Sequence, residues 1–388
     1  MKNKAVILGT NYYIGLSIIR CLGREGVYTV SMDYSKKNTY GSKSKYLKEQ
    51  IICPHYEKES EKLKDFLIDY AKKQDEKPVL FPSADQYAEF IDKYLLELKE
   101  YFYIWMSEEG LWTKIMDKDE LFKLAVKYNM PVPETISPKE KNFLSLVEKD
   151  IGFPCLIKPT DSPKFVSEFR EKLFKCNNFK ELEDKLNLIE EKNLDVIVQR
   201  MIPGFDNNMY TFDFYANENS DVTHWTTCRK HRQYPINYGA SVYTEQKYIK
   251  ELYDIGVPFL KKIGYKGFGE IEFKKDSSNG NYYLIEINAR TTNLNSLLNK
   301  VGLNFPYIAY RDILGNPIEE KAVDYNTNIY FRYLQEDVLA IKSYIKTKQL
   351  RKREIIKSLF HKKAPAIWSL DDPMPGIFYF KEVINKIV

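Results

Sequence analysis

Acidic and amide side chains alternate along two neighbouring segments, residues 269–274 and 283–290. In an extended strand, residues two apart share a face. One face would therefore carry these side chains: Glu270 and Glu272 on the first segment, then Glu286, Asn288 and Arg290 on the second. Mg²⁺ prefers oxygen ligands and usually shares them with nucleotide phosphates, and two carboxylates with one amide oxygen suit that need. The spacing is consistent with a metal–nucleotide site and also with an exposed, salt-bridged hairpin.

Three other motifs favour the nucleotide site. Met116-Asp117-Lys118 precedes a helix, and residues 155–159 form an apolar strand that ends with Lys158 before a proline. A lysine in that position is unusual for a plain hydrophobic core. Residues 196–204 run from a third apolar strand into a Pro-Gly turn.

The first glycine turn gives a competing interpretation. Gly9 and Gly15 follow an apolar strand, and Asp33 ends the next strand, where a ribose-binding acid would stand in a dinucleotide-binding fold. That motif needs a second glycine for the pyrophosphate, and Asn11 stands in its place. The turn is therefore expected to be structural.

The elements around these residues fall into two classes. Residues 4–8, 27–32, 51–53 and 78–81 read as buried strands that alternate with helices at 14–23 and 59–72. This βαβ order predicts a parallel sheet with helices outside it. Farther along, strands at 210–216, 222–228, 269–273 and 282–287 lie close in sequence, with Asn279-Gly280 between the last two. That order predicts antiparallel hairpins and an α+β half.

In this order the motifs resemble those of the ATP-grasp superfamily, over roughly residues 1–317. The resemblance implies a fold class of α/β and α+β. A Rossmann-like pre-ATP-grasp domain at 1–106 would precede an ATP-grasp domain at 107–317, whose two α+β subdomains clamp ATP. The lid subdomain would span about 120–200 and the second subdomain about 201–317, completed by residues 318–388.

The resemblance also implies roles for single residues. Lys118 and Lys158 would contact the nucleotide phosphates, Asp206 the ribose, and residues 199–202 the adenine; these four are Gln199, Arg200, Met201 and Ile202. Glu272, Glu286 and Asn288 would bind Mg²⁺ or Mn²⁺. Arg290 would stabilise the acyl phosphate and the tetrahedral intermediate.

A second basic cluster follows, Cys228-Arg229-Lys230-His231-Arg232-Gln233-Tyr234-Pro235. It resembles a subgroup of carboligases that includes enzymes similar to D-aspartate ligase. Lys230 and Arg232 are therefore expected to face the phosphates or the substrate carboxylate as catalytic residues. The glycine-rich lid loop of many members is missing from residues 160–165, and Lys172 just downstream could supply a phosphate contact.

Composition excludes several classes of protein. The net charge is only +5 over 388 residues, so no basic stripe for nucleic acid is expected, and residues 346–353 read as a solvated helix face. The five cysteines form no CxxC pair, which favours a reducing, cytoplasmic setting without disulfides. No segment is apolar enough to span a membrane. The expected partners are small carboxylate and amine substrates, and a homodimer is left open.

These observations predict an ADP-forming carboxylate–amine ligase that uses ATP and Mg²⁺ and passes through an acyl phosphate. Amino acids are the expected substrates, with D-aspartate in cell-wall precursor synthesis suggested by the subgroup. Two alternatives stay open, an NAD-dependent oxidoreductase and a nucleotide-binding module without catalysis.

Overall fold

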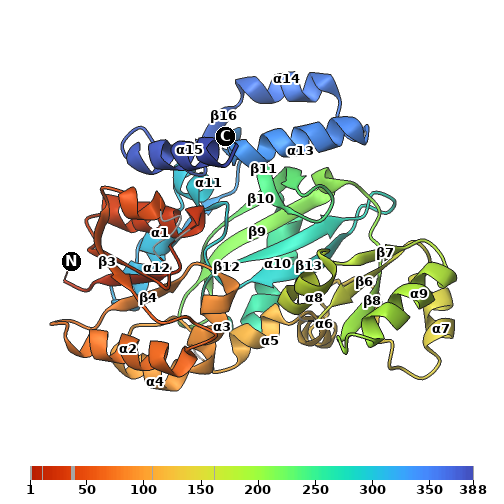
Figure 1. Ribbon diagram of the computed structural model, residues 1–388, viewed down its shortest axis with the longest axis horizontal. Helices are drawn as coiled ribbons and strands as arrows, with labels where there is room; N and C mark the ends of the chain where they lie inside the picture. Colours follow the sequence, from red (N-terminus) through yellow and green to blue (C-terminus); the bar gives the residue numbers. More distant parts are fainter. Residues whose placement is uncertain (1, 11, 36–39, 107, 161, 388) are drawn as a thin grey trace.

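The strands of the protein form three sheets (Figure 1). The computed structural model describes residues 2–10, 12–35, 40–106, 108–160 and 162–387. Asn11, which breaks the glycine motif, and Asp161, in the segment expected to form the lid loop, lie outside the described residues.

The N-terminal sheet is parallel, with the strand order β3-β2-β1-β4. Its first strand, β1 (Ala5–Leu8), is buried throughout, as expected for a strand covered on both sides. The other strands and the helices that cover them are β2 (Thr29–Asp33), β3 (Leu47–Ile52), β4 (Val79–Pro82), α1 (Tyr13–Arg24), α2 (Ser60–Lys72), α3 (Asp85–Lys93) and α4 (Leu95–Tyr101). The predicted βαβ arrangement is confirmed.

The glycine turn after β1 is held from within. Gly9 has φ +80°, a backbone conformation that favours glycine. The next residue, Thr10, donates its backbone N–H to Asp33 Oδ2 at 2.7 Å, and Asp33 is fully buried. Because Asp33 closes this turn, it is not exposed for a ribose, and the dinucleotide interpretation loses its one matching acid.

A small antiparallel sheet follows, with the order β5-β8-β6-β7. Its elements are β5 (Thr135–Ile136), α7 (Phe143–Leu146), which runs into a π-helical turn (Val147–Ile151), β6 (Cys155–Pro159), α8 (Ser162–Phe169), β7 (Phe174–Cys176), α9 (Phe179–Glu190) and β8 (Val196–Arg200). This sheet has a hydrophobic core of its own. It lies at one end of the molecule, beside the large sheet (Figure 1).

Helix α8 stands where the sequence suggested a lid loop without glycine. Phe165 and Phe169 lie four residues apart on this helix, with ring centroids 4.7 Å apart. Both rings pack against Phe174 of β7, at 5.1 and 5.2 Å. A segment without glycine and with apolar residues at this spacing can form a packed helix.

The large sheet has eight strands, ordered β13-β12-β9-β10-β11-β15-β16, with β14 beside β10. All neighbours are antiparallel except β15 with β16 and β10 with β14. The strands are β9 (Met209–Ala216), β10 (Val222–Tyr234), β11 (Ala240–Gln246), β12 (Gly267–Lys275), β13 (Tyr282–Asn288), β14 (Lys321–Val323), β15 (Ile329–Arg332) and β16 (Lys362–Pro365). The predicted hairpins are confirmed, whereas β11, β14 and β16 were not predicted.

Helices pack around the large sheet and join it to the N-terminal half. The remaining helices are α5 (Leu111–Met116), α6 (Lys118–Lys127), α10 (Lys250–Lys262), α11 (Asn295–Lys300), α12 (Phe305–Ile313), α13 (Leu334–Lys346), α14 (Lys352–Phe360) and α15 (Met374–Ile387). One hydrophobic core joins α1, α11 and α12 to the N-terminal sheet and to the large sheet. All five cysteines are buried and free, and no described helix is long and apolar enough to cross a membrane.

Candidate active site

The two acidic strands pair as predicted. In the antiparallel register of β12 and β13, Glu272 lies opposite Glu286, and Glu270 lies opposite Asn288. Residues directly opposite each other share a face, so these four polar side chains form one patch. Among the described residues, no three His, Cys, Asp or Glu side chains gather as a metal site. A divalent ion here would therefore bind two carboxylates and the Asn288 amide and take its remaining ligands from phosphate oxygens.

Lys230 of β10 supplies a cation to this patch. Its ammonium group lies 2.5 Å from Glu272 Oε2, and the two side chains are only 4% and 12% exposed. Burial alone would lower the pKa of Lys230, but the carboxylates of Glu272, Glu270 and Glu286 outweigh burial and raise it. Lys230 therefore stays charged and balances part of the acidic patch, at the place where a metal ion would act.

A hydrogen-bonded chain fixes the amide of Asn288. Its Nδ2 donates to Glu270 Oε1 at 2.9 Å, and its Oδ1 accepts from Arg290 Nη2 at 3.2 Å. Because one bond needs the amide nitrogen and the other the amide oxygen, the two together set which way the amide points. Arg290 is held in turn by both oxygens of Asp85, at 2.7 and 3.0 Å, at the start of helix α3.

Behind Glu270 lies a second buried acid, Asp213 of β9. Glu270 and Asp213 are paired across the β9–β12 register, and both are at most 2% exposed. Burial raises the pKa of Asp213 to about 6, although the hydrogen bond that Thr211 donates at 2.7 Å opposes this. Burial and the Asp213 charge raise the pKa of Glu270 well above its usual range. If these two acids shared one proton, the pair would carry a single negative charge.

The small sheet contributes lysines from the other side. Lys158 lies one residue before the end of β6, is 6% exposed, and forms no ion pair with a described residue. Burial first, and then the charges of Lys118 and Lys274, lower its pKa to about 7, although Glu286 opposes this shift. Lys172, in the exposed loop before β7, acts electrostatically on Glu272. Cations from both sheets thus approach the carboxylates, an arrangement that suits a polyphosphate.

Lys158 should make nucleotide binding depend on pH. A bound phosphate would raise its pKa again, so binding above pH 7 must take up a proton. We expect the affinity for Mg·ATP to fall by up to about tenfold per pH unit as pH rises above about 7. Calorimetric titration from about pH 7 to about pH 9, in two buffers of different ionisation enthalpy, measures both the affinity and the proton uptake.

The variant Lys158→Met is the control for that slope, because it removes the titrating group. Its affinity should be lower and nearly independent of pH; an unchanged slope would contradict the assignment.

The lowered pKa of Lys158 affects the stability of the fold in the opposite direction. The folded pKa of about 7 lies below the ordinary 10.5, so the unfolded chain binds more protons between these values. Stability without nucleotide should therefore rise with pH across that window.

The segment predicted to hold adenine joins the two sheets. Gln199 and Ile202 are buried, Met201 is half-buried, and Gln199 Nε2 donates to Thr135 Oγ1 at 2.8 Å. Arg200 pairs with Glu134 and, at 3.2 Å, with Asp276. The Arg200 guanidinium is thus held between the small sheet and the end of β12, which positions this connection.

Asp206, predicted to bind the ribose, has a structural contact as well. It is 3% exposed, and its Oδ2 accepts hydrogen bonds from Asn237 N at 2.8 Å and from the hydroxyl of Tyr344 on α13. One of its two oxygens is thus engaged within the protein, and the ribose role stays a prediction.

The structure does not bring Arg232 to the carboxylates. The β10–β11 register shifts between Lys230, which lies opposite Thr244, and Arg232, which lies opposite Tyr243. Consecutive residues of a strand point to opposite faces, so this β-bulge sends the two cations different ways. Arg232 instead binds both oxygens of Asp337 on α13, at 2.5 and 3.0 Å. Lys230 thus contacts Glu272 whereas Arg232 contacts Asp337, and a role of Arg232 toward the phosphates or the substrate carboxylate stays a prediction.

Arg232 should therefore matter for stability. It and Asp337 are 3% and 0% exposed, and Arg332 also donates to Asp337, at 2.9 Å. We expect Arg232→Met to lower the free energy of unfolding by about 3 kcal/mol, because the fully buried Asp337 would lose one of its two arginine partners. Urea denaturation measures this loss. Lys123→Met, which removes the exposed ion pairs of Lys123 with Asp119 and Glu120 on α6, should cost much less stability. Equal effects of the two variants would contradict the placement of Arg232.

Sequence reasoning missed Asp213 and Asp85 as members of the site. Asp213 interrupts an otherwise apolar, aromatic strand, and this acid in a buried strand was a usable signal. Asp85 lies 205 residues before Arg290, and nothing local to either residue announces their pairing.

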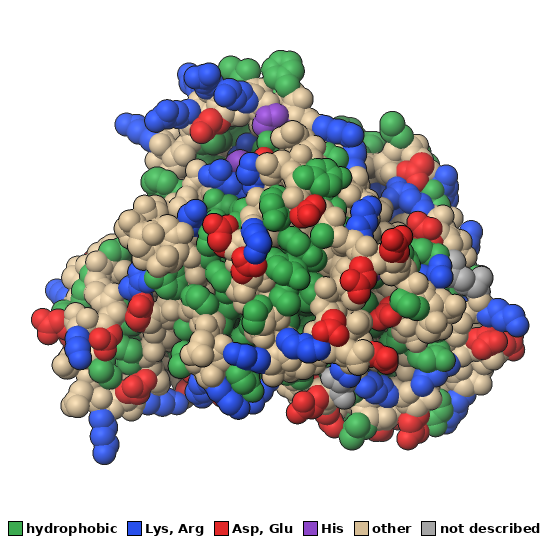
Figure 2. All heavy atoms as spheres, turned by 180° about the vertical axis from the view of Figure 1, so that it is seen from behind, with side chains coloured by type: hydrophobic (Ala, Val, Ile, Leu, Met, Phe, Trp, Pro, Cys, Tyr) green, Lys and Arg blue, Asp and Glu red, His purple; other side chains and the backbone are tan. Residues whose placement is uncertain are grey.

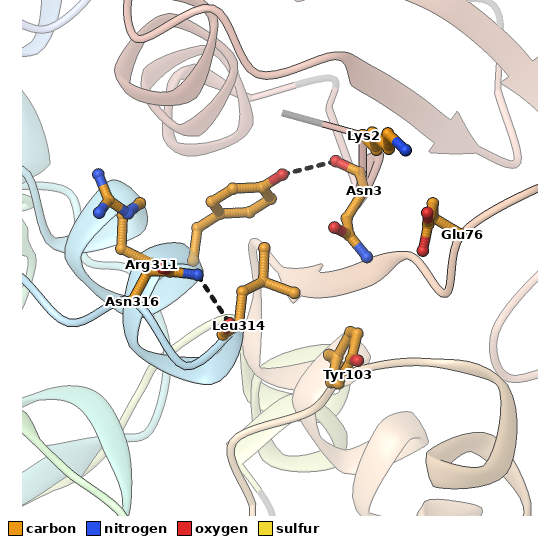
Figure 3. A pocket seen from close by; sticks show the side chains of 8 residues that line it. Lys2, Asn3, Glu76, Tyr103, Arg311, Leu314 and Asn316 are labelled. Atoms are coloured by element: carbon orange, nitrogen blue, oxygen red, sulfur yellow. Dashed lines mark hydrogen bonds between the residues drawn. The ribbon is translucent and has the colours of Figure 1, made fainter.

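A cavity with a volume of about 480 Å³ lies elsewhere, between the N-terminus and α12. Figure 3 shows Lys2, Glu76, Tyr103 and Arg311 along its wall, with the Tyr310 hydroxyl donating to Asn3 O at 2.7 Å. None of the predicted site residues lines this cavity.

The chain is similar in sequence to known proteins. The family described as carbamoyl-phosphate synthase L chain, ATP binding domain, matches residues 217–320. A D-aspartate ligase of Enterococcus faecium is 29% identical over 265 residues, which cover 65% of this chain and 62% of that protein. A D-alanine–D-alanine ligase of Pelagibacter ubique is 25% identical over 187 residues, 45% of this chain and 58% of that protein. The chain spans about three fifths of the length of these two relatives.

The fold is also found among solved structures. The biotin carboxylase domain of 2-oxoglutarate carboxylase from Hydrogenobacter thermophilus, in complex with Mg·ADP and bicarbonate, superposes with a TM-score of 0.67 at 18% identity. The match covers 85% of this chain and 74% of that one. At this identity the likeness concerns the fold alone.

Proposed function

We infer that this chain, an ATP-grasp protein, is an ATP-dependent ligase that joins a carboxylate to an amine. The observation that carries the proposal is the meeting of Glu272, Glu286 and Asn288 on one face of β12 and β13 with Lys158 and Lys118 from the small-sheet side. Oxygen ligands for a divalent ion and cations for phosphates would then line one space. The alternative, an NAD site, would need Asp33 for a ribose, and this acid is buried in the turn.

The residues would divide the work of phosphoryl transfer to a carboxylate. A bound Mg²⁺ would neutralise the charge that develops on the transferring phosphoryl group. Lys158 and Lys118 would hold the phosphates of ATP, and Lys230 would face the transferred group. Arg290, oriented by Asp85, would stabilise the acyl phosphate and the oxyanion formed when the amine attacks it. Lys172, on the loop before β7, would approach when the small sheet closes.

An amino acid is the substrate class that we favour. Burial raises the pKa of Tyr12 to about 12, and the charges of both Glu336 and Arg290 act on it. Burial also raises the pKa of Glu336 on α13, while Lys172 opposes that shift. A carboxylate and cations around a partly exposed tyrosine match the opposite charges of a zwitterion. D-Aspartate, the substrate in the name of the relative from Enterococcus faecium, is the first compound to test.

The test is ADP release from Mg·ATP over a panel of D- and L-amino acids, each offered with and without a second amino acid as amine. We expect release that depends on one carboxylate and rises when an amine is added. Nucleotide binding without release for any pair would favour a module without catalysis. Tight binding of NADH in a fluorescence titration would favour the oxidoreductase.

A further inference from the structure

Positive charge is concentrated in one segment near the C-terminus, residues 342–363, which spans the end of α13, all of α14 and the start of β16. We call it the basic segment. It carries nine cations and one acid, a net charge of +8, while the whole chain carries only +5. The rest of the chain is therefore negative overall. The cations are Lys342, Lys346, Lys348, Arg351, Lys352, Arg353, Lys357, Lys362 and Lys363.

This charge is not neutralised within the protein. Among the described residues, none of the nine cations forms an ion pair. The one acid, Glu354, accepts a hydrogen bond from the backbone N–H of Arg351 at 3.1 Å, so it caps its own helix. Figure 2 shows Lys and Arg side chains gathered at the upper edge of the molecule, where α14 lies, beside hydrophobic ones.

Helix α14 presents apolar side chains to solvent in the middle of this charge. Ile356, Leu359 and Phe360 are 57%, 57% and 82% exposed, and their spacing of three and four residues puts them on one face. Ser358 is the one fully buried side chain of the helix. Ile345, near the end of α13, is also exposed, at 44%. The protein itself thus leaves the apolar face of a basic, amphipathic helix uncovered.

We propose that the basic segment docks the protein on a bilayer surface that contains anionic lipids, with Ile356, Leu359 and Phe360 entering the interface. Cations that flank an exposed apolar face are the combination such a surface binds, because headgroups attract the charge and acyl chains cover the apolar atoms. A nucleic acid would use the charge and leave Phe360 in water. A second copy would bring the same +8 segment against this one, and the like charges would repel.

Docking in this way would hold the active site close to the membrane. Helix α13 leads into the basic segment, and its first turn carries Glu336, the carboxylate proposed above to lie near the substrate. The negative remainder of the chain would be repelled by the same surface, which favours one orientation with α14 toward the lipid.

The experiment is co-sedimentation of the full-length protein with two kinds of vesicle, one of phosphatidylcholine alone and one of equal parts phosphatidylcholine and phosphatidylglycerol. We expect binding at least about tenfold tighter to the anionic vesicles, and loss of that binding in about 1 M salt. The triple variant Lys352→Glu, Arg353→Glu, Lys357→Glu should lose it to background. The double variant Leu359→Ser, Phe360→Ser should weaken it about tenfold or more.

The matched control is Leu96→Ser, which removes an aliphatic side chain that is 67% exposed on α4 and should bind as the wild type does. All three variants should keep their circular dichroism spectrum and their ADP release. Equal affinity for neutral vesicles, or no binding to either kind, would overturn the proposal. So would binding of a DNA duplex in place of vesicles, or a dimer that the double variant dissociates.

Discussion

Replacing Glu286 by Gln should abolish ADP release, with a loss of about a thousandfold or more, while the protein stays folded. Glu286 lies directly opposite Glu272 on β13, and the amide would remove one of the two carboxylates available for a divalent ion. The fold should survive, because burial and then the charge of Glu286 both raise the pKa of Glu272. Removing that charge relieves repulsion, so the metal-free variant should unfold at the same temperature as the wild type or higher.

The comparison variant for Glu286 is Glu245→Gln. Glu245 lies on β11 of the same sheet, with a side chain that is 12% exposed and that hydrogen-bonds His231 Nε2 at 2.9 Å. The two substitutions make the same chemical change, and only the first touches the acidic patch. ADP release should stay within about threefold of wild type in Glu245→Gln. If Glu286→Gln kept full activity, the metal assignment would be wrong.

Replacing Lys230 by Met should separate stability, metal binding and catalysis. Without nucleotide, Glu272 would lose its buried partner, and the free energy of unfolding should fall by about 3 kcal/mol. The affinity for Mn²⁺ alone should rise, because the cation that competes for Glu272 would be gone. ADP release should fall about a hundredfold, because a positive charge beside the transferred group would be missing.

Three measurements follow these effects in one protein: urea denaturation, titration of Mn²⁺ by electron paramagnetic resonance, and ADP release. Lys230→Arg retains the charge and should keep most of the stability. Weaker Mn²⁺ binding in Lys230→Met would contradict the view that Lys230 occupies the metal's place in the ligand-free protein.

The features that follow from local alternation could be predicted from the sequence. The strands at 269–273 and 282–287 carry polar and apolar residues with period two. A shift of their pairing register by one residue would bury the polar face. Their register pairs Glu272 with Glu286, so the shared patch is confirmed. The resemblance to ATP-grasp proteins is confirmed by the comparisons and the fold. The roles of the single residues stay predictions.

The features that depend on distant contacts could not be predicted. Asp85, at the start of helix α3, holds Arg290 across 205 residues, and Tyr344 binds Asp206 across 138 residues. The basic residues after Cys228 were expected to lie between strands, yet β10 continues to Tyr234. In each case tertiary packing decided the outcome.

The extra residue at His231 also affects how this protein should be aligned with others. A strand without the bulge would present the side chains at both cationic positions to the substrate, whereas here one of them anchors a C-terminal helix. Suppose that two sequences share this motif but that one strand is a residue shorter. Their equivalent arginines would then lie on opposite faces of the sheet. An alignment gap of one position at this point therefore changes the role expected of the aligned arginine. Deleting His231 would test whether the arginine can change from anchoring the helix to facing the substrate.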